Sequence, residues 1–404
     1  MRWIGVFLAS TLCAAEPLTL EHALSLAEQN HPRLQEAVAR IEMAAAGIGT
    51  AKAYPNPVLD LAGGYQNARI AGAVPGSYQY YIFAQQLELP SVRQTRIQAA
   101  EINKQGSQLA QAEVLLAVKN SVRHAFFESL RWKGIIELAQ QNLRLVEELR
   151  RRVQTRVEVG EAGRLELVRA EAEVATASSF ANRAQLQLVS TLSALRAAIG
   201  APPEADLDPK GTLETPQLPP IKDLREEVLN ENPSLAQARA EIRRAESLLK
   251  NEQAQRKPQP LTHFEWERLP DTSVYKVGVA LPLPLWNRRE GPIAESQAAL
   301  RRAKATADRQ YVEFTAALES AYGRYQIAGQ QVSAFEGGIL KEAEEAVRSS
   351  EVAYQLGERG ILEVLDAQRV LRTVRLDFLN AQYDRQSALT DLRYLRALDS
   401  KGTP

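Results

Sequence analysis

Two long stretches without proline constrain this chain more than any other feature of its sequence. They run over residues 91–201 and 293–403, and each is 111 residues long. Proline inside a helix removes a backbone donor and costs about 3 kcal/mol, so these stretches are where long helices can form. Prolines gather outside them, and six lie in residues 201–220 alone. We interpret residues 201–220 as an extended, proline-rich linker.

The equal lengths of the two stretches indicate an internal duplication, and the residues support it. Residues 157–170 align with residues 354–367 at a constant offset of 197, and both glycines, a glutamate and the final alanine are among the identities. We therefore divide the chain into a first repeat (16–200), the linker, a second repeat (221–398) and a tail (399–404).

Each proline-free stretch carries a Gly-x-x-Gly pair at the matching place, Gly160 with Gly163 and Gly357 with Gly360. Glycine allows the left-handed backbone that ends helices, so each pair predicts a helix–turn–helix. The alternative is one interrupted helix. A single arm would extend about 100 Å at 1.5 Å per residue, and it needs neighbouring helices along its length. The predicted helical hairpins cover residues about 92–199 and about 293–397.

Two shorter segments, about 58–89 and about 261–284, predict β-hairpins. In the second segment Phe264 and Trp266 fall on one face and Glu265 on the other. Strands of about 9–11 residues with one apolar face can span a bilayer. After the N-terminal leader, no segment approaches the roughly 18 apolar residues of a transmembrane helix, so we expect strands to make any membrane crossing.

The number of predicted strands bears on assembly. About eight strands are the practical minimum for a closed barrel, so a chain with four must oligomerise to form one. A dimer would give eight strands and a filled interior, whereas a trimer would give twelve and an open lumen. The alternative is a small soluble sheet that caps a helical bundle.

Residues 1–15 are typical of a signal peptide, with Arg2 followed by an apolar run and then small residues. Cys13 is the only cysteine of the sequence. Leu12 departs from the small residue that precedes a lipidated cysteine, which leaves lipidation of Cys13 an open alternative.

Composition excludes several classes of function. Lys+Arg and Asp+Glu both count 49, which gives no basic excess for binding nucleic acid. The four histidines (22, 31, 124 and 263) lack the spacing of metal ligands, and no phosphate loop or nucleophile motif appears. We therefore expect no metal site, no cofactor, no catalytic residue and no enzyme activity.

Taken together, these features make the sequence similar to the outer-membrane efflux protein family of TolC-like channels, from about residue 18 to 398. The resemblance rests on the duplication, the openings at Asn30–Leu34 and Asn232–Leu235, the Leu281–Leu285 segment and, most specifically, Tyr354–Gln368. It implies a mainly α fold with a small β part. By this resemblance, duplicated long helical hairpins would form an α-barrel, and four strands per protomer would contribute to a trimeric twelve-stranded transmembrane β-barrel.

The resemblance also implies a function. The chain would be the outer-membrane channel of a tripartite efflux system, surrounded by outer-membrane lipid and with a large periplasmic portion. It would passively conduct substrates from an inner-membrane pump and a periplasmic adaptor, and it is similar to the heavy-metal or cation efflux subclass. Two alternatives are a periplasmic adaptor and a secreted coiled-coil scaffold without a channel. An adaptor would show one hairpin between β-rich domains, and two tandem hairpins favour the channel.

The family resemblance also implies functional roles for the two turns and for the helices that follow them. The turns would contact the adaptor, although chain reversal alone also explains their glycines. The matching positions are Gly160, Gly163, Arg164 and Leu165 in the first repeat, and Gly357, Gly360, Ile361 and Leu362 in the second.

A periplasmic gate is implied just past the second turn. Glu363 and Asp366 lie three residues apart and share a helix face, so a trimer would place six carboxylates near its axis. Such rings favour cations. The first repeat retains Glu166, but Arg169 replaces the aspartate, and we expect Arg169 to pair with an acidic neighbour. The alternative for all four is an ordinary solvated helix face.

Overall fold

The computed structural model describes residues 17–67, 69–213, 216 and 218–398. The predicted signal peptide, with Cys13, and the tail lie outside the described residues. The chain divides into two compact units, and each takes segments from both sequence repeats. The first unit contains the described residues up to 35, residues 113–232 and residues from 313 on; the second contains residues 36–112 and 233–312.

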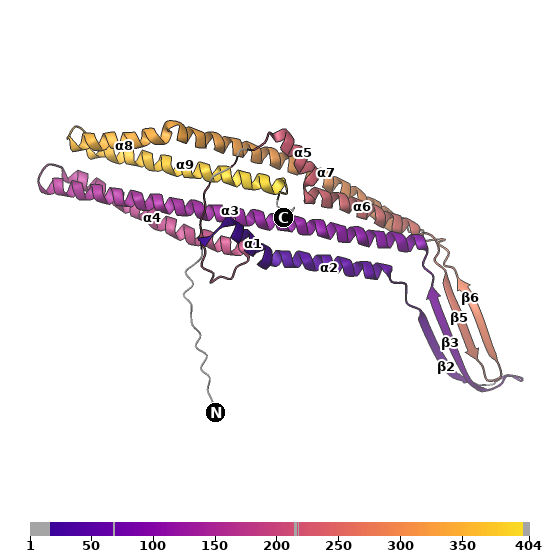
Figure 1. Ribbon diagram of the computed structural model, residues 1–404. Helices are drawn as coiled ribbons and strands as arrows, with labels where there is room; N and C mark the ends of the chain where they lie inside the picture. Colours follow the sequence, from indigo (N-terminus) through magenta and orange to yellow (C-terminus); the bar gives the residue numbers. More distant parts are fainter. Residues whose placement is uncertain (1–16, 68, 214–215, 217, 399–404) are drawn as a thin grey trace, which may run out of the picture. The chain divides into compact units, whose positions relative to one another are not determined.

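Long paired helices dominate the structure, as the sequence predicts, and the mainly α fold class with a small sheet is confirmed. The first hairpin consists of α3 (Pro90–Glu158) and α4 (Arg164–Ile199), which ends where Gly200 adopts a φ of 75°. The second hairpin consists of α7 (Glu290–Ala334), α8 (Leu340–Gln355) and α9 (Ile361–Leu395) (Figure 1). Pro90 begins α3, where a missing backbone donor does no harm.

The first arm of the second hairpin, which contains α7 and α8, is interrupted, unlike its counterpart α3. A π-helix over Phe335–Ile339 separates α7 from α8. Gly338 has a φ of 156°, which side chains other than glycine rarely adopt. The residues at the same offset in the first repeat, 138–142, continue α3 without a break. The adjacent glycines Gly337 and Gly338 therefore explain why one repeat breaks and the other does not.

Shorter helices precede each strand pair. In the first repeat they are α1 (Leu20–Asn30) and α2 (Pro32–Lys52), and in the second α5 (Ile221–Glu231) and α6 (Pro233–Ala254). A proline starts the second helix of each pair and prevents the first from continuing. Inside the linker, β4 (Asp208–Pro209) pairs in parallel with β1 (Pro17–Leu18), so part of the linker belongs to a small sheet.

Three helices of the first unit meet at one carboxylate. Asp391 of α9 accepts His124 Nε2 of α3 at 2.8 Å and Arg324 Nη2 of α7 at 3.0 Å. Nearby, Leu224 of α5 packs fully buried against Leu392 of α9. These contacts position α9, the helix that carries the predicted gate carboxylates at its other end.

One antiparallel sheet of four strands belongs to the second unit (Figure 1). Its order is β2-β3-β5-β6, so pairing of β3 with β5 joins the hairpins of the two repeats. The hairpins begin at 58 and 261 as expected but end at Gln86 and Ala280, before the expected 89 and 284. Pro260 lies opposite Leu87 and Pro282 follows β6, and proline cannot donate to a ladder. The strands are β2 (Val58–Gln66), β3 (Gly76–Gln86), β5 (Leu261–Arg268) and β6 (Ser273–Ala280).

The two faces of this sheet differ in chemistry. The cross-strand register places large apolar side chains on one face, where Trp266 stacks between Tyr81 and Tyr275 at centroid distances of 4.9 and 6.3 Å. On the other face Lys276 Nζ contacts Glu265 at 3.2 Å and Glu267 at 3.3 Å. The apolar face consists of Leu59, Leu61, Tyr81, Phe83, Phe264, Trp266, Tyr275 and Val277.

Among the residues that the structure describes, no helix combines the length and the apolar character needed to cross a membrane.

Candidate functional site: the paired helical turns

The turns that follow α3 and α8 have the same backbone design. Gly160 and Gly357 adopt φ values of 80° and 76°, in the left-handed region. The next residue in each turn donates its N–H back to the helix, Glu161 to Arg156 O at 2.8 Å and Glu358 to Ala353 O at 3.0 Å. These bonds satisfy carbonyls that a helix end would otherwise leave free. The second glycines, Gly163 and Gly360, start α4 and α9 from extended backbone instead.

We expect Gly160→Ala and Gly357→Ala each to lower the free energy of unfolding by about 1–2 kcal/mol, because a Cβ disfavours the left-handed backbone. No atom lies within 4 Å of the Cβ that either substitution would add, so strain alone would cause the loss. The matched control is Gly163→Ala, which meets equally open space at a φ of −81° and should change little. Unfolding in detergent, followed by circular dichroism, measures all three; an equal loss in the control would contradict the assignment.

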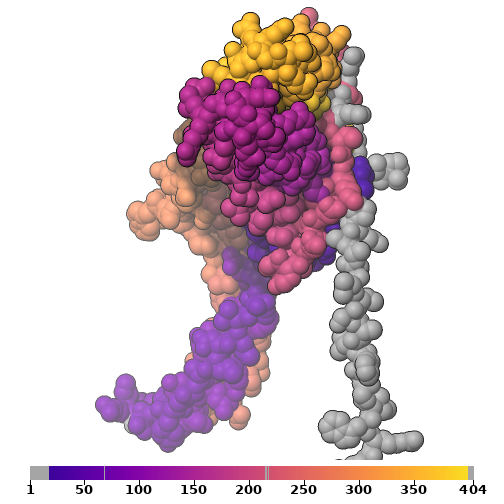
Figure 2. Space-filling model, turned by 90° about the vertical axis from the view of Figure 1, so that its left-hand side faces the viewer, coloured from indigo at the N-terminus to yellow at the C-terminus, as the bar shows by residue number. Residues whose placement is uncertain are grey.

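Beneath the turns, the two hairpins share one apolar core. Val153 of α3, Ala170 of α4 and Val364 of α9 are almost fully buried in it together with Tyr354 of α8. Figure 2 views this end of the first unit, where the yellow end of the second hairpin lies against the magenta end of the first. The two turns are therefore held as a pair rather than as independent loops.

The residues predicted to contact an adaptor separate into two groups. Ile361 is only 1% exposed and packs in the shared core. The others are exposed, and Leu165 and Leu362 are the large apolar side chains among them, at 61% and 48%. The exposed set is Gly160, Gly163, Arg164, Leu165, Gly357, Gly360 and Leu362.

The predicted gate carboxylates lie at the start of α9. Glu363 and Asp366 are both exposed. Glu363 occupies the first turn of the helix, where the positive end of the helix dipole favours a carboxylate. Asp366 Oδ1 lies 3.9 Å from Arg369 Nη1, one turn further along.

The first repeat differs at the matching positions. Glu166 is half-buried and accepts the Tyr354 hydroxyl at 3.5 Å. Arg169 is exposed and forms no ion pair within the described part of this single chain, so its pairing with an acidic neighbour stays a prediction for the assembled channel. Arg169 lies about 100° around α4 from the buried Ala170 and is exposed there.

The sequence did not lead us to predict a buried ion cluster that joins α4 and α9. Glu173 of α4 is 5% exposed and accepts bonds from Arg369 at 2.6 and 3.1 Å and from Arg372 at 3.2 Å. Glu173 raises the pKa of the Arg369 guanidinium through these bonds. The available signal was helix phase, because Glu173 lies between Ala170 and Ala177 on the buried stripe of α4.

Tyr354 links three elements of the turn region. The Arg156 guanidinium of α3 lies 4.9 Å from the centre of its ring, and its hydroxyl donates to Glu166 of α4. Burial, followed by the nearby Glu166 carboxylate, raises the pKa of the Tyr354 hydroxyl. Arg156 in turn lies 3.7 Å from Glu161 in the first turn. The turn therefore connects through polar contacts to the helix of the other hairpin.

A groove of about 530 Å³ lies beside this network, between α3 and α8 with α9 at its base. Its walls combine apolar side chains such as Leu145 and Leu149 with charges of both signs, including Arg152 and Glu351. Grooves with this mixture suit an amphipathic helix, whose apolar stripe is bordered by charges.

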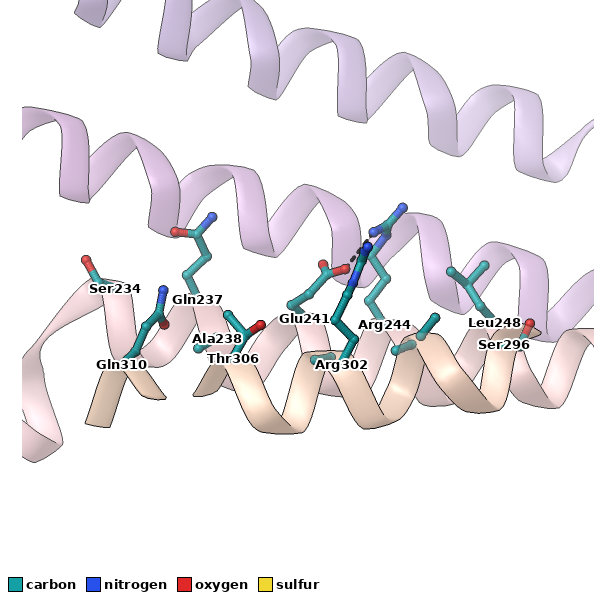
Figure 3. Close-up of a pocket in the computed structure, with 13 residues that line it drawn as sticks. Ser234, Gln237, Ala238, Glu241, Arg244, Leu248, Ser296, Arg302, Thr306 and Gln310 are labelled. Atoms are coloured by element: carbon teal, nitrogen blue, oxygen red, sulfur yellow. Dashed lines mark hydrogen bonds and ion pairs between the residues drawn. The ribbon is translucent and has the colours of Figure 1, made fainter. Parts of the chain in front are cut away.

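A second groove, of about 560 Å³, lies between α6 and α7 in the other unit. Figure 3 shows Arg244 and Glu241 of α6, whose side chains pair at 2.9 Å, opposite Arg302 of α7. Small residues such as Ala238 and Ser234 form much of the lining. Within the described ranges, no group of three His, Cys, Asp or Glu side chains is arranged to hold a metal ion.

Comparison with known proteins follows the same division of the chain. The family model described as "Outer membrane efflux protein" matches residues 23–201 and 224–396, which cover both repeats. The chain is 26% identical to the cobalt-zinc-cadmium resistance protein CzcC of Cupriavidus metallidurans over 391 residues, covering 94% of this chain and 90% of that protein. It is also 26% identical to the nickel-cobalt-cadmium resistance protein NccC of Alcaligenes xylosoxydans xylosoxydans over 309 residues, 75% of this chain and 68% of that protein.

Solved structures share the fold. The structure of CusC has a TM-score of 0.81 at 18% identity and covers 93% of this chain and 91% of its own. The outer membrane protein VceC of Vibrio cholerae has a TM-score of 0.80 at 19% identity and covers 94% of this chain and 96% of its own.

Proposed function

We propose that three copies of this chain, which belongs to the outer membrane efflux protein family, assemble into a duct for heavy-metal cations. The chain is an outer-membrane efflux channel component with a large periplasmic portion. The observation that carries the proposal is the four-stranded sheet, with one exposed apolar face and two open edges. Val277 is 83% exposed and Leu61 60%, which suits contact with lipid rather than water.

The open edges support a trimer. β2 and β6 each have one partner within the described residues, and an unpaired edge in lipid leaves backbone donors and acceptors unsatisfied. Pairing β6 of one copy with β2 of the next removes every edge. Three copies give twelve strands and an open lumen, whereas two give a barrel filled by its own side chains. The face with Glu265 and Lys276 then lines the lumen.

Two observations support metal cations as the transported substrate. The names of CzcC and NccC assign those relatives to resistance against cobalt, zinc, cadmium and nickel. In this chain Glu363 and Asp366 are exposed at the start of α9, where three copies would place a ring of carboxylates that favours cations. The cations are substrates passing through, and the energy for their export comes from a partner pump.

The turns and the groove beside them are proposed to receive a periplasmic adaptor that connects the duct to an inner-membrane pump. Leu165 and Leu362 are exposed at the end of the hairpins, and the adjacent groove is bordered by Arg152 and Glu351. A helical hairpin of the adaptor could place its apolar stripe along this groove.

Purified protein reconstituted into planar bilayers tests the proposal. We expect discrete conductance steps whose reversal potential in a salt gradient reports preference for cations over anions, and a trimer mass by native mass spectrometry. The same detergent without protein is the control. Correctly inserted trimers that never conduct, or conduct with a preference for anions, would contradict the proposed duct.

A further inference from the structure

Two exposed apolar segments flank the open edges of the sheet. One is the Tyr54 segment (residues 53–57), which leads into β2; the other is the Trp286 segment (residues 281–286), which leaves β6. Tyr54 is 65% exposed and Trp286 is 93% exposed. Large exposed aromatic side chains that lie beside other exposed apolar residues mark interaction surfaces. Leu281, Leu283 and Leu285 add further exposed apolar area beside Trp286.

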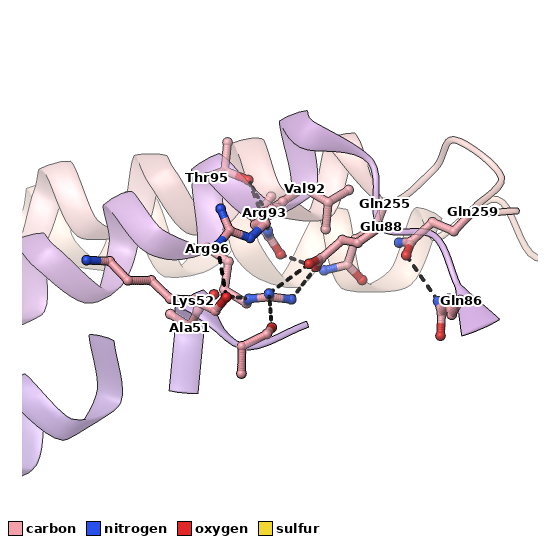
Figure 4. Close-up of polar contacts among 12 residues, drawn as sticks. Ala51, Lys52, Gln86, Glu88, Val92, Arg93, Thr95, Arg96, Gln255 and Gln259 are labelled. Atoms are coloured by element: carbon pink, nitrogen blue, oxygen red, sulfur yellow. Dashed lines mark hydrogen bonds and ion pairs between the residues drawn. The ribbon is translucent and has the colours of Figure 1, made fainter. Parts of the chain in front are cut away.

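Arginines of α3 bind the backbone carbonyls that lead into the Tyr54 segment (Figure 4). The Arg93 guanidinium lies 4.6 Å from the centre of the Tyr54 ring, and its Nη2 donates to Lys52 O at 2.9 Å. Arg96 donates to Ala51 O at 2.9 Å and Ala53 O at 3.1 Å, and it also pairs with Glu88. These bonds fix the carbonyls at the end of α2, so the aromatic ring is presented in one place.

Contacts of Arg289 anchor the chain three residues beyond the Trp286 segment, where α7 begins. Arg289 adopts a φ of 58°, a left-handed conformation that is strained for a side chain other than glycine. Its backbone N–H donates to Asn287 Oδ1 at 3.0 Å, and its guanidinium donates to Glu252 Oε2 of α6 at 3.1 Å. Arg289 therefore redirects the chain into α7 at a fixed point and leaves Trp286 outside.

Strand direction brings these two segments together between copies. The sheet is antiparallel throughout, so the start of β2 and the end of β6 lie at the same end of the sheet. When β6 of one copy pairs with β2 of the next, the Trp286 segment continues past the end of β6 toward the Tyr54 segment of the neighbour. Prolines at 55, 57, 282 and 284 prevent the strand ladder from continuing here, so contact must use side chains.

We infer that the Trp286 segment of one copy packs on the Tyr54 segment of the next and forms an apolar seam that closes the ring of strands at its helical end. The inference rests on the proposed trimer and adds the surface and partner. A second copy explains both segments at once, because each borders an edge that the neighbour must pair. Lipid contact would explain aromatic side chains at this end of the sheet, but not why each segment borders an unpaired edge.

Cysteine cross-linking tests the seam. Tyr54→Cys is combined in turn with Leu283→Cys, Leu285→Cys and Trp286→Cys, and the trimers are treated with a bismaleimide. We expect at least one pair to give covalent dimers and trimers, and single variants and the wild-type chain to give none. The matched control is Tyr65→Cys with Trp286→Cys, because Tyr65 is 66% exposed but lies at the opposite end of β2.

Native mass spectrometry of the same samples separates the seam from the trimer. Trimers that form but cross-link from no Tyr54 pair, or equally from the Tyr65 pair, would overturn the seam and leave the trimer standing. Absence of trimers in any variant and in the wild type would overturn both.

Lipid is the competing occupant, and fluorescence in bilayers of brominated lipid distinguishes it. Two variants are compared, one whose only tryptophan is Trp286 and one whose only tryptophan is Trp266 on the apolar face of the sheet. We expect strong quenching of Trp266 and clearly weaker quenching of Trp286, which the neighbouring copy covers. Equal quenching of the two would place Trp286 in lipid and overturn the seam.

Discussion

Arg369→Ala combined with Arg372→Ala is expected to lower the free energy of unfolding by about 3–5 kcal/mol, because it leaves the Glu173 carboxylate buried without a partner. Glu173 is 5% exposed, so water cannot replace the lost bonds. Glu173→Met is expected to cost much less. Its arginine partners have side chains that are 48% and 24% exposed and can turn into solvent.

The decisive measurement is the triple variant, Glu173→Met with both arginine substitutions. Removing the stranded carboxylate should recover most of the stability that the arginine pair variant loses, as followed by circular dichroism during unfolding in detergent. Arg348→Ala is the control, since Arg348 and Glu345 form an exposed pair whose loss costs less than about 1 kcal/mol. A triple variant less stable than the arginine pair variant would show that Glu173 contributes something other than its charge.

Glu363→Ala combined with Asp366→Ala is expected to reduce the preference of the duct for cations over anions by about tenfold or more, because narrow passages lined by one sign of charge concentrate counter-ions by that order. In the proposed trimer these substitutions remove six carboxylates from the proposed gate. Loss of the ring also removes side chains that narrow the opening, so single-channel conductance should rise. Reversal potentials and step sizes in planar bilayers measure both effects.

Glu171→Ala provides the matched control for the gate. Glu171 is an exposed carboxylate of the first hairpin, and it lies about 140° around α4 from Glu166, the partner of Glu363 in the repeat. Its removal changes the same kind of charge on another face. An unchanged cation preference after loss of Glu363 and Asp366, or an equal change after loss of Glu171, would refute the carboxylate ring.

The candidate site shows how far sequence reasoning reached. Helix pairs, the Gly160 and Gly357 turns and the faces of β5 followed from local rules, because proline, left-handed backbone and alternation act over a few residues. The burial of Glu173 was not predicted, because it depends on packing between helices rather than on neighbouring residues. Glu171 and Glu173 look alike in sequence, and two residues apart on a helix they face opposite sides, so only the position of α9 decides which one is buried.

The charges near Arg169 show the same dependence on packing. The charge reversal between the repeats predicts an ion pair for Arg169, whereas the buried ion pair within one chain joins Arg369 and Glu173. Arg169 and Glu173 lie one turn apart on α4, but Arg169 is exposed while Glu173 is buried and binds Arg369 of α9. Charges in a sequence indicate that pairs exist, and packing selects the partners.

The sequence by itself determined the long helices, the places where they turn back and the alternation of the strands, because each depends on the backbone preferences of neighbouring residues. Tertiary structure alone decided that β3 pairs with β5 across the repeats, that Glu173 is buried between two arginines and that the Tyr54 and Trp286 segments flank the open edges of one sheet. These features join residues that are far apart along the chain, and their energies exist only once the helices and strands have packed.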